Sequence, residues 1–423
     1  MLSILLLLLL QAVQTAESGI VPAGDLIKLG KQVEARVTKL RGLPLKKPIR
    51  WQVSSKEQIR AYLRETLAQQ YAPGEIEHEG DAYKALGMLP RELDYRAVIL
   101  ALYEEQVGGY YDPKKKTFFL ADWIAPAMQE PIIVHELDHA LGDQNFNLEK
   151  FVERIRGNSD AMLAHSAVVE GDATLLMMLD VLSAQGVQLD FSTLDLDGAV
   201  GSAMMAMSSA QFSQFSEAPR LLREALMFPY LKGLAFVANG QKRGGWIAID
   251  KVYADLPAST EQILHPEKYF QRRDPPVPVS LGMVDQVIPK EWERIYDDVL
   301  GEFMMLQVLE GVSDRDEAKQ AAEGWGGDRV RVYQRGQEFA WVALSVWDSQ
   351  RDAVEFAGAF SKTVQSRLPK FVLQPQETSK PELVWKGPDD RVVSVVRNGS
   401  SVLIVENFDR ALALKIRQSI LPH

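Results

Sequence analysis

The segment HELDH at residues 135–139 constrains this chain more than any other feature of its sequence. His135, Glu136 and His139 follow the pattern H-E-x-x-H, and residues four apart lie one above the other on an α-helix. We therefore predict a helix over residues 130–141, whose two imidazoles can reach one metal ion. The fold must then bring a further ligand to this face, because a catalytic zinc needs three protein ligands and one open position.

Each residue type in the motif suits zinc chemistry. Neutral imidazoles bind zinc, and zinc lowers the pKa of a bound water toward about 7. Glu136 lies beside the histidine face and is the candidate general base. A chance match is the alternative reading, although the chain has only 6 histidines and two of them flank this glutamate. Asp138 is an unusual charge inside the motif and is expected either to bind a group beside the metal or to face solvent.

We look for the third ligand on the next long helix, predicted over residues 158–184 with Ser159 or Asp160 as its N-cap. Glu170, in the segment VVEGDA, is favoured as that ligand. His165 is the competitor, five residues earlier and therefore on a different side of the helix.

Three further residues near the expected ligands are candidates for shaping the site or orienting a ligand. Gly171 removes a side chain beside the metal helix and allows two helices to approach closely. Asp172 and Asp143 are rival candidates for orienting a ligand histidine, since such histidines usually donate their second N–H to a carboxylate or carbonyl. Either acid could equally be an ordinary surface residue.

The rest of the N-terminal part is predicted to be mainly helical. Apolar spacing predicts helices over residues 25–41, 54–71, 91–106, 217–240 and 259–269, with interruptions at Pro229 and Pro266. Alternating bulky and polar residues around Asp112-Pro113 predict a β-hairpin over residues 107–122. Residues 186–216 have weak periodicity and are predicted to form a loop with a short helix.

A proline-rich segment at residues 272–284 predicts a boundary between a first domain at 19–280 and a second at 281–423. The second domain mixes helices, predicted at 292–311, 314–325, 353–368 and up to Ser419, with strands at 330–333, 339–346, 391–397 and 401–406. We thus predict an α+β chain: a mainly helical domain with a β-hairpin, followed by a smaller α+β domain.

Composition limits the classes of partner and the cellular compartment. The net charge is −10, which argues against nucleic acid as a partner. Residues 1–18 are predicted to be a signal peptide, because the apolar run Leu2–Val13 is too short to span a bilayer and small residues follow it. Export to the periplasm or the extracellular space follows. No Lys or Arg precedes the run, so an uncleaved anchor is the alternative and the one expected membrane contact.

The chain contains no cysteine. Disulfides, thiolate metal ligands and a cysteine nucleophile are therefore excluded, and any zinc must be held by histidine and carboxylate ligands.

At His135, Glu136, His139 and Glu170 the sequence resembles the gluzincin metallopeptidases, which carry H-E-x-x-H on one helix and a glutamate, often within EGxA, on a later one. The segments EQVGGYYDP, HELDHALGDQ, VVEGDA, FPYLKGLAFV, GGW, STEQILHPEKY and AAEGWGGDR resemble, in order, a family of largely uncharacterised bacterial and archaeal proteins of this type. The resemblance implies a zincin-like fold and bound zinc, with no known substrate.

The resemblance also implies where substrate would bind. In gluzincins a strand beside the active helix holds extended substrate, and Tyr110 and Tyr111 lie just upstream of the H-E-x-x-H helix. A core hairpin without a ligand is the alternative. Candidates for a donor to the oxyanion are Tyr230, His265 and Tyr269, although His265 could instead tie down its own short helix.

Two functions remain open from the sequence. The first is an exported zinc-dependent hydrolase, a metallopeptidase that acts on a peptide or protein and uses Glu136 as its base. Hydrolysis of a non-peptide amide would use the same chemistry. The second is a non-enzymatic zincin scaffold that binds partners at the cell envelope.

Overall fold

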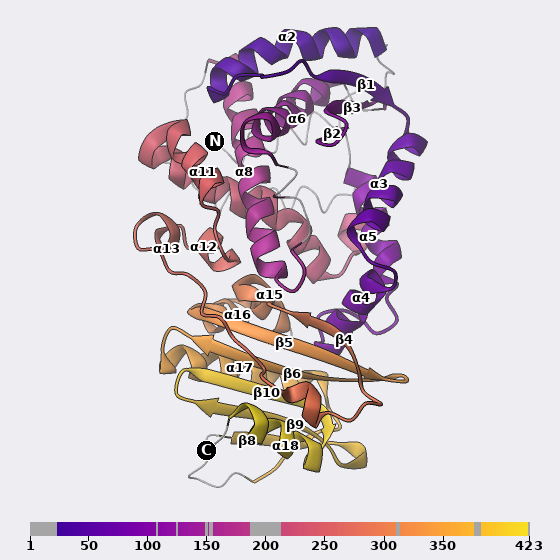
Figure 1. Cartoon of the computed structure of the whole chain (residues 1–423), viewed down its shortest axis with the longest axis vertical. Coiled ribbons are helices and arrows are strands. Elements are labelled where there is room, and N and C mark those ends of the chain that lie inside the picture. The colour runs from indigo at the N-terminus through magenta and orange to yellow at the C-terminus, as the bar shows by residue number, and fades with distance from the viewer. Residues whose placement is uncertain are drawn as a thin grey trace.

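The computed structural model describes residues 23–106, 109–123, 126–148, 151, 155–186, 213–309, 314–375 and 382–421. The predicted signal peptide and most of the predicted loop at 186–216 lie outside these residues. Figure 1 shows a mostly helical half above and a broad β-sheet with its helices below. The prediction of a mixed α+β chain, helical first and then sheet-containing, is confirmed.

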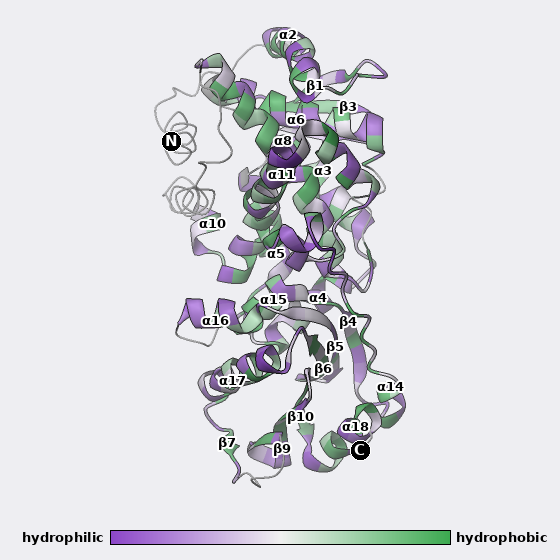
Figure 2. Cartoon of the chain, turned by 90° about the vertical axis from the view of Figure 1, so that its left-hand side faces the viewer, coloured by the Kyte–Doolittle hydropathy of each residue, from purple (hydrophilic) through white to green (hydrophobic). Residues whose placement is uncertain are grey.

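The long helices α6, α8 and α11 form the centre of the upper half, and other helices surround them (Figure 1). The helices of this half are α2 (Ala23–Arg41), α3 (Lys56–Gln70), α4 (Glu75–Ala85), α5 (Tyr95–Gln106), α6 (Pro126–Phe146), α8 (Ser159–Ala184), α10 (Ser213–Glu217), α11 (Arg220–Ala254), α12 (Thr260–Leu264) and α13 (Glu267–Phe270). The central α8 packs against both α6 and α11. Figure 2 shows hydrophobic residues gathered around α6 and α8.

A small sheet lies beside α6. Strands β1 (Arg50–Ser54), β2 (Gly109–Asp112) and β3 (Thr117–Ala121) have the order β1-β3-β2. The hairpin β2–β3 is antiparallel, as predicted, whereas β1 pairs with β3 in parallel. β1 is too short and too polar to be recognised without its partner. β2 is an edge strand of this sheet.

Several helix ends differ from prediction. The N-cap of α8 is Asn158, whose side chain accepts from the Ala161 N–H at 2.9 Å, so neither Ser159 nor Asp160 is the cap. Pro229 does not interrupt α11, which continues to Ala254 with a kink at Gly244–Gly245. The kink follows from Gly245, which adopts a positive φ of 63° that glycine tolerates.

The lower half is built on an antiparallel sheet of 7 strands in the order β4-β5-β6-β10-β9-β8-β7. The strands are β4 (Glu293–Asp298), β5 (Trp325–Arg335), β6 (Glu338–Trp347), β7 (Val372–Leu373), β8 (Glu382–Lys386), β9 (Arg391–Asn398) and β10 (Ser401–Asp409). The predicted helix over residues 292–311 is wrong in its first half. Those residues form β4 because they pair with β5, and helix starts only after Leu300.

Helices cover both faces of this sheet. The helices of this half are α14 (Val284–Val287), α15 (Gly301–Val308), α16 (Arg315–Ala322), α17 (Gln350–Arg367) and α18 (Arg410–Ile420), with a 3₁₀ turn at Pro388–Asp390. One face packs on α17, where Trp347 stacks on Phe356. The other packs on α14 and α18, which share a buried cluster with Phe408.

The two halves share a core. A single buried apolar cluster runs from the helical half into the sheet, and the rings of Phe228 in α11 and Phe303 in α15 lie 4.7 Å apart. The start of α8 is tied to the sheet, because the Ser159 N–H donates to Asp298 of β4 at 2.8 Å. The boundary near residue 280 therefore stays a prediction. Among the described residues, no helix is long and apolar enough to cross a membrane.

Candidate metal centre

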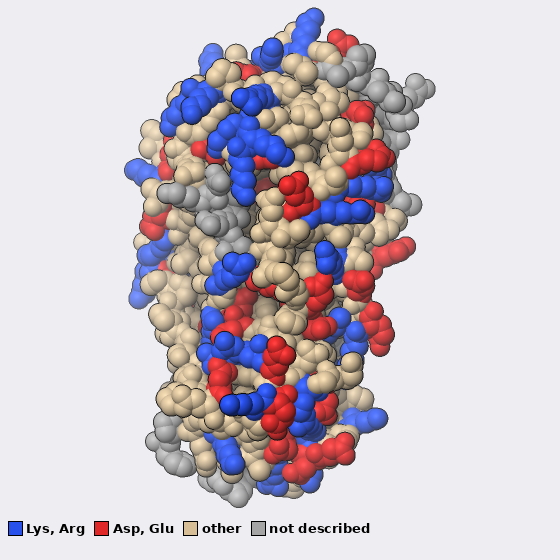
Figure 3. Space-filling view, turned by 45° about the vertical axis from the view of Figure 1, so that its right-hand side comes forward, with Lys and Arg blue, Asp and Glu red and all other residues tan. Residues whose placement is uncertain are grey.

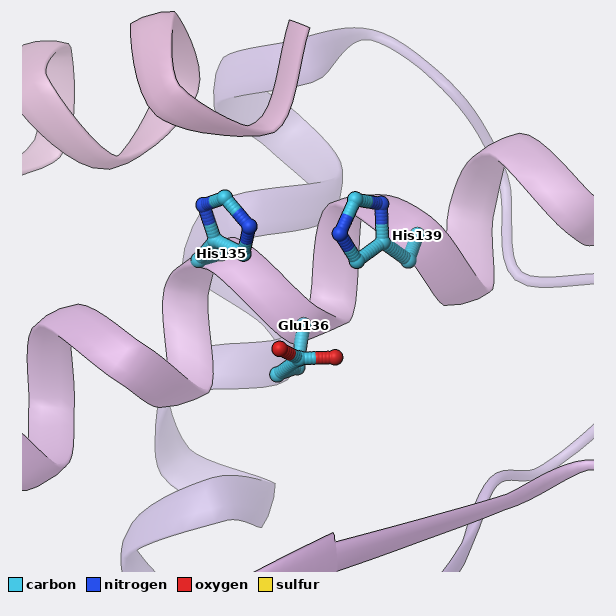
Figure 4. A group of neighbouring side chains, drawn as sticks. All are labelled: His135, Glu136 and His139. Carbon is cyan, nitrogen blue, oxygen red and sulfur yellow. The ribbon is translucent and has the colours of Figure 1, made fainter. Parts of the chain in front are cut away.

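Helix α6 buries apolar side chains on one face and carries the two histidines of the motif on another. Ile133, Val134 and Leu137 are buried in a cluster shared with α2 and β3. His135 and His139 consequently project from another side of the helix, where their ring centroids lie 4.8 Å apart at 88°. Figure 4 shows the two imidazoles on one side of α6, with the Glu136 carboxylate below and between them. Ligand atoms of these three residues all lie within 4.8 Å of one another.

Glu170 completes the group from α8. Its Oε2 lies 3.1 Å from Nε2 of His135 and 3.5 Å from Nε2 of His139. His165 is half-buried on the same helix and, among the described residues, makes no hydrogen bond or ion pair with either imidazole. The preference for Glu170 over His165 thus agrees with the geometry of the two helices.

The electrostatics of this group favour a positive charge. Burial opposes protonation of His139, but the carboxylates of Glu170, Glu136 and Asp138 together raise its pKa to about 10. Burial likewise opposes ionisation of Glu170, yet the two histidines hold its pKa well below the usual range. A protonated imidazole or a bound cation can supply the charge that these carboxylates require.

Three observations indicate that a metal fits these residues. Ligands about 2.0–2.2 Å from zinc in tetrahedral geometry lie about 3.3 Å from each other, close to the 3.1 and 3.5 Å that separate Glu170 from the two histidines. The donors are two imidazoles and one carboxylate, which suits zinc. All three side chains are partly exposed, between 13% and 24%, so solvent reaches the site.

Glu136 is held beside the ligands by the hairpin. The backbone N–H of Tyr111 in β2 donates to Glu136 Oε2 at 2.8 Å. Burial raises the pKa of Glu136, and the nearby Glu170 adds to that increase, although the histidines and the Tyr111 hydrogen bond oppose it. A carboxylate with a raised pKa is better matched to proton transfer near neutral pH than an exposed one.

The side chains of the hairpin tyrosines serve the fold. The Tyr111 hydroxyl donates to Asp143 at 2.9 Å, and the Lys116 ammonium donates to the same oxygen at 2.7 Å. Asp143 is therefore engaged by the hairpin and does not orient a histidine. The ring of Tyr110 stacks on Tyr62 of α3 at 4.0 Å. What faces Glu136 is thus the backbone edge of β2.

A buried ion cluster lies behind the metal helix. Arg41, fully buried at the end of α2, donates to Asp172 at 2.9 Å and lies 2.9 Å from Asp250 and 3.6 Å from Asp138. Asp172 also accepts from the Tyr253 hydroxyl at 2.9 Å. Asp138 is buried, so the prediction that it faces solvent is wrong, and the group it meets is Arg41. Asp172 binds arginine and tyrosine, not a ligand histidine. Sequence reasoning missed Arg41, although three acids on largely apolar helices require a cation.

Gly171 permits a close approach, but to another helix than expected. A Cβ on Gly171 would lie 2.2 Å from the backbone of Gly233 in α11, and one on Gly233 would lie 2.0 Å from the carbonyl oxygen of Ala167. The glycine pair therefore brings α8 and α11 together, not α8 and α6. This crossing brings Tyr230 of α11 to the site, where its ring centroid lies 6.1 Å from that of His135.

Of the three proposed oxyanion donors, only Tyr230 lies at the site. Negative charge on Glu170, together with burial, raises the pKa of Tyr230, so its hydroxyl stays protonated. His265 instead lies 2.9 Å from Glu302 of α15. The Tyr269 hydroxyl donates to the carbonyl of Asp255 at 2.5 Å. The expectation for His265 and Tyr269 is corrected: each is engaged in holding its own short helix.

A second group of acids is close enough to hold an ion but already contains a protein cation. Glu261, Asp274 and Asp348 approach one another closely. The Lys268 ammonium lies 2.6 Å from Glu261, 3.3 Å from Asp274 and 2.6 Å from Asp348. This ammonium already lies where an ion would bind these three acids, so we do not regard the group as a metal site.

Comparison with known proteins adds one finding. A family model described as a domain of unknown function (DUF8575) matches residues 290–417. These residues comprise most of the lower sheet and its helices and exclude the candidate metal centre. No curated protein matches the chain. No solved structure matches it either.

Proposed function

We propose that this protein is an exported zinc-dependent hydrolase, most simply a metallopeptidase of zincin type. The observation that carries the proposal is the convergence of His135 Nε2, His139 Nε2 and Glu170 Oε2 from two helices, with Glu136 beside them. A chance H-E-x-x-H would not require a third ligand at this distance. The predicted signal peptide supports export.

The three ligand residues would hold zinc, and Glu136 would act beside it. When bound, zinc supplies Lewis acidity, which polarises a substrate carbonyl and makes water a better nucleophile. Glu136 accepts the proton of the attacking water and later delivers it to the leaving amine. The Tyr111 N–H fixes one carboxylate oxygen of Glu136 and leaves the other available for this transfer.

The edge of β2 would bind the substrate backbone. Because β2 is the last strand of its sheet and its Tyr111 N–H faces Glu136, an extended peptide along this edge would pass the general base. Main-chain hydrogen bonds recognise any sequence, so this strand supports a peptide over a non-peptide amide.

Tyr230 would stabilise the developing oxyanion. Its hydroxyl stays protonated because burial and the charge of Glu170 raise its pKa. Helix α11 carries Tyr230 and crosses α8 beside the two histidines, where the Tyr230 ring lies 6.1 Å from that of His135. A neutral hydroxyl aimed at a developing negative charge lowers the barrier by up to a few kcal/mol.

The test begins with zinc content and turnover in the same preparation. The purified native protein is expected to bind about one zinc per chain and to cleave members of a broad, mass-spectrometry-read peptide library. Glu136→Gln is the matched variant, since it keeps the shape and the acceptor for Tyr111 but removes the base. Retained zinc with lost cleavage supports the proposal.

Two outcomes would change the proposed function. Cleavage that survives Glu136→Gln would make the assigned base wrong. Full zinc binding without any cleavage by the native protein, together with unchanged partner binding in the variant, would favour the non-enzymatic scaffold. Tyr230→Phe separates the donor role, because it should lower kcat with little change in KM.

A further inference from the structure

One end of this acidic protein is strongly basic. Residues 23–56 contain nine Lys and Arg but only two acids, Asp25 and Glu34, a net charge of +7 in a chain whose total is −10. The segment comprises α2, the loop after it and β1. Figure 3 shows Lys and Arg gathered over the upper part of the molecule, where Figure 1 places these elements.

Six of these cations are free for a partner. Each of them is exposed to solvent and forms no salt bridge with any described residue. We call this set the basic cap: Lys28, Lys31, Lys39, Lys46, Lys47 and Arg50. The three remaining cations are not part of it, since Arg41 is buried, Arg36 pairs with Asp180, and Lys56 is the first residue of α3, beyond β1.

The geometry of α2 makes the basic cap one-sided. At 100° per residue, Lys28, Lys31 and Lys39 fall within about 80° of one another. The buried Leu26 and Val37 lie on the opposite side, packed into the cluster with α6. Lys28 and Lys39 are 11 residues apart, so this row runs along about 17 Å of α2, and Lys46, Lys47 and Arg50 continue the basic cap beyond the helix. Such an extent suits a broad anionic surface better than a single bound peptide.

We propose that the basic cap docks onto the anionic headgroups of a phospholipid membrane. Its position along the chain supports this partner, because the apolar run Leu2–Val13 ends only ten residues before α2 begins. In the chain that retains this run as an uncleaved anchor, the alternative to cleavage, the basic cap would lie next to the lipid surface. Each Lys or Arg near an anionic surface contributes independently to binding, and salt screens the attraction. The lower half carries no part of the basic cap, so it faces away from the membrane.

The test uses the full chain and vesicles of phosphatidylcholine with or without phosphatidylglycerol. Binding to neutral vesicles measures the apolar segment alone, and the increment caused by phosphatidylglycerol measures the basic cap. Lys46→Glu/Lys47→Glu/Arg50→Glu should lower affinity for anionic vesicles by roughly 100-fold or more without changing binding to neutral ones. The matched control, Lys290→Glu/Lys370→Glu/Lys415→Glu, reverses three exposed cations of the lower half and should retain most of the increment.

Three results would overturn the proposal: no increment with phosphatidylglycerol, an increment that persists at high salt, or equal losses in the two triple variants. Polyglutamate serves as the competing probe. If it binds the native protein tightly while anionic vesicles do not, the partner is an acidic polypeptide and the membrane assignment is wrong. Circular dichroism of both variants confirms that the folded state is preserved.

Discussion

Two clusters of acidic and metal-ligating side chains, one inside the helical half and one between the helical half and the sheet, differ in the cation that lies among them. In the first, His135, His139 and Glu170 converge with no lysine or arginine among them. In the second, Glu261, Asp274 and Asp348 surround the Lys268 ammonium. Ligand atoms lie close enough to hold an ion in both places, among His135, Glu136 and His139 in the first and among the three acids in the second. The comparison teaches that close acids do not by themselves indicate a metal, because a lysine can lie where the ion would bind.

The largest expected effect comes from removing the third ligand of the first cluster. Glu170→Gln should weaken zinc binding by roughly 1,000-fold, more than the 10- to 100-fold typical of changes outside the ligand shell. The reason is that an amide oxygen carries no negative charge and so does not offset the positive charge of zinc. Chelator competition with a zinc indicator measures the affinity. The matched control is Glu261→Gln in the second cluster, which should leave zinc binding unchanged. Equal losses in both would break the distinction.

Arg41 extends the comparison to a fully buried cation. Arg41→Met leaves Asp138, Asp172 and Asp250 without their counter-ion, and we expect a loss of about 3–5 kcal/mol in the free energy of unfolding. Arg41→Lys keeps the charge but not the planar fork, and its loss should be smaller. Urea denaturation measures both. If Arg41→Met were as stable as the native protein, this cluster would not help to hold α2, α6, α8 and α11 together.

Without its lysine, the second cluster should become able to bind an added metal ion, as is proposed for the first. Lys268→Met leaves three carboxylates facing one another, and stability should fall by about 2 kcal/mol, less than for Arg41 because Asp274 and Asp348 are 44% and 38% exposed. Added Ca²⁺ should then restore the melting temperature of Lys268→Met and leave that of the native protein unchanged. A variant that ignores Ca²⁺ would show that these acids cannot form a cation site.

The smallest effect is a pH dependence that belongs to the second cluster. Burial raises the pKa of Glu261 from 4.5 to about 7, although Lys268 opposes the rise. The folded state therefore binds more protons than the unfolded state between these two values, and the contribution of Glu261 to stability is present at low pH and lost as pH rises toward 7. The unfolding free energy should fall within this window with a slope of at most about 1.4 kcal/mol per pH unit. Glu261→Gln should flatten that part of the curve of unfolding free energy against pH, and an unchanged slope would contradict the assignment.

The local elements were largely predictable from sequence because their signals are local. The apolar spacing over residues 54–71 predicted α3, which begins with a capping box between Ser55 and Gln58. Pro266 separates α12 from α13 as expected. β4 was mistaken for helix, because its apolar residues suit either period and only pairing with β5 decides between them.

By itself, the sequence determined the H-E-x-x-H spacing and with it two candidate ligands, because four-residue spacing is a property of a single helix. The preference for Glu170 came from its place on the next long helix and from the resemblance to gluzincins. Only the tertiary structure decided which partners these residues meet. The crossing at Gly171 and Gly233 brings Tyr230 to the histidines, and Arg41 takes Asp172 away from them. These contacts depend on how separate helices pack, and packing follows from shape and charge across the whole core, not from spacing within any one segment.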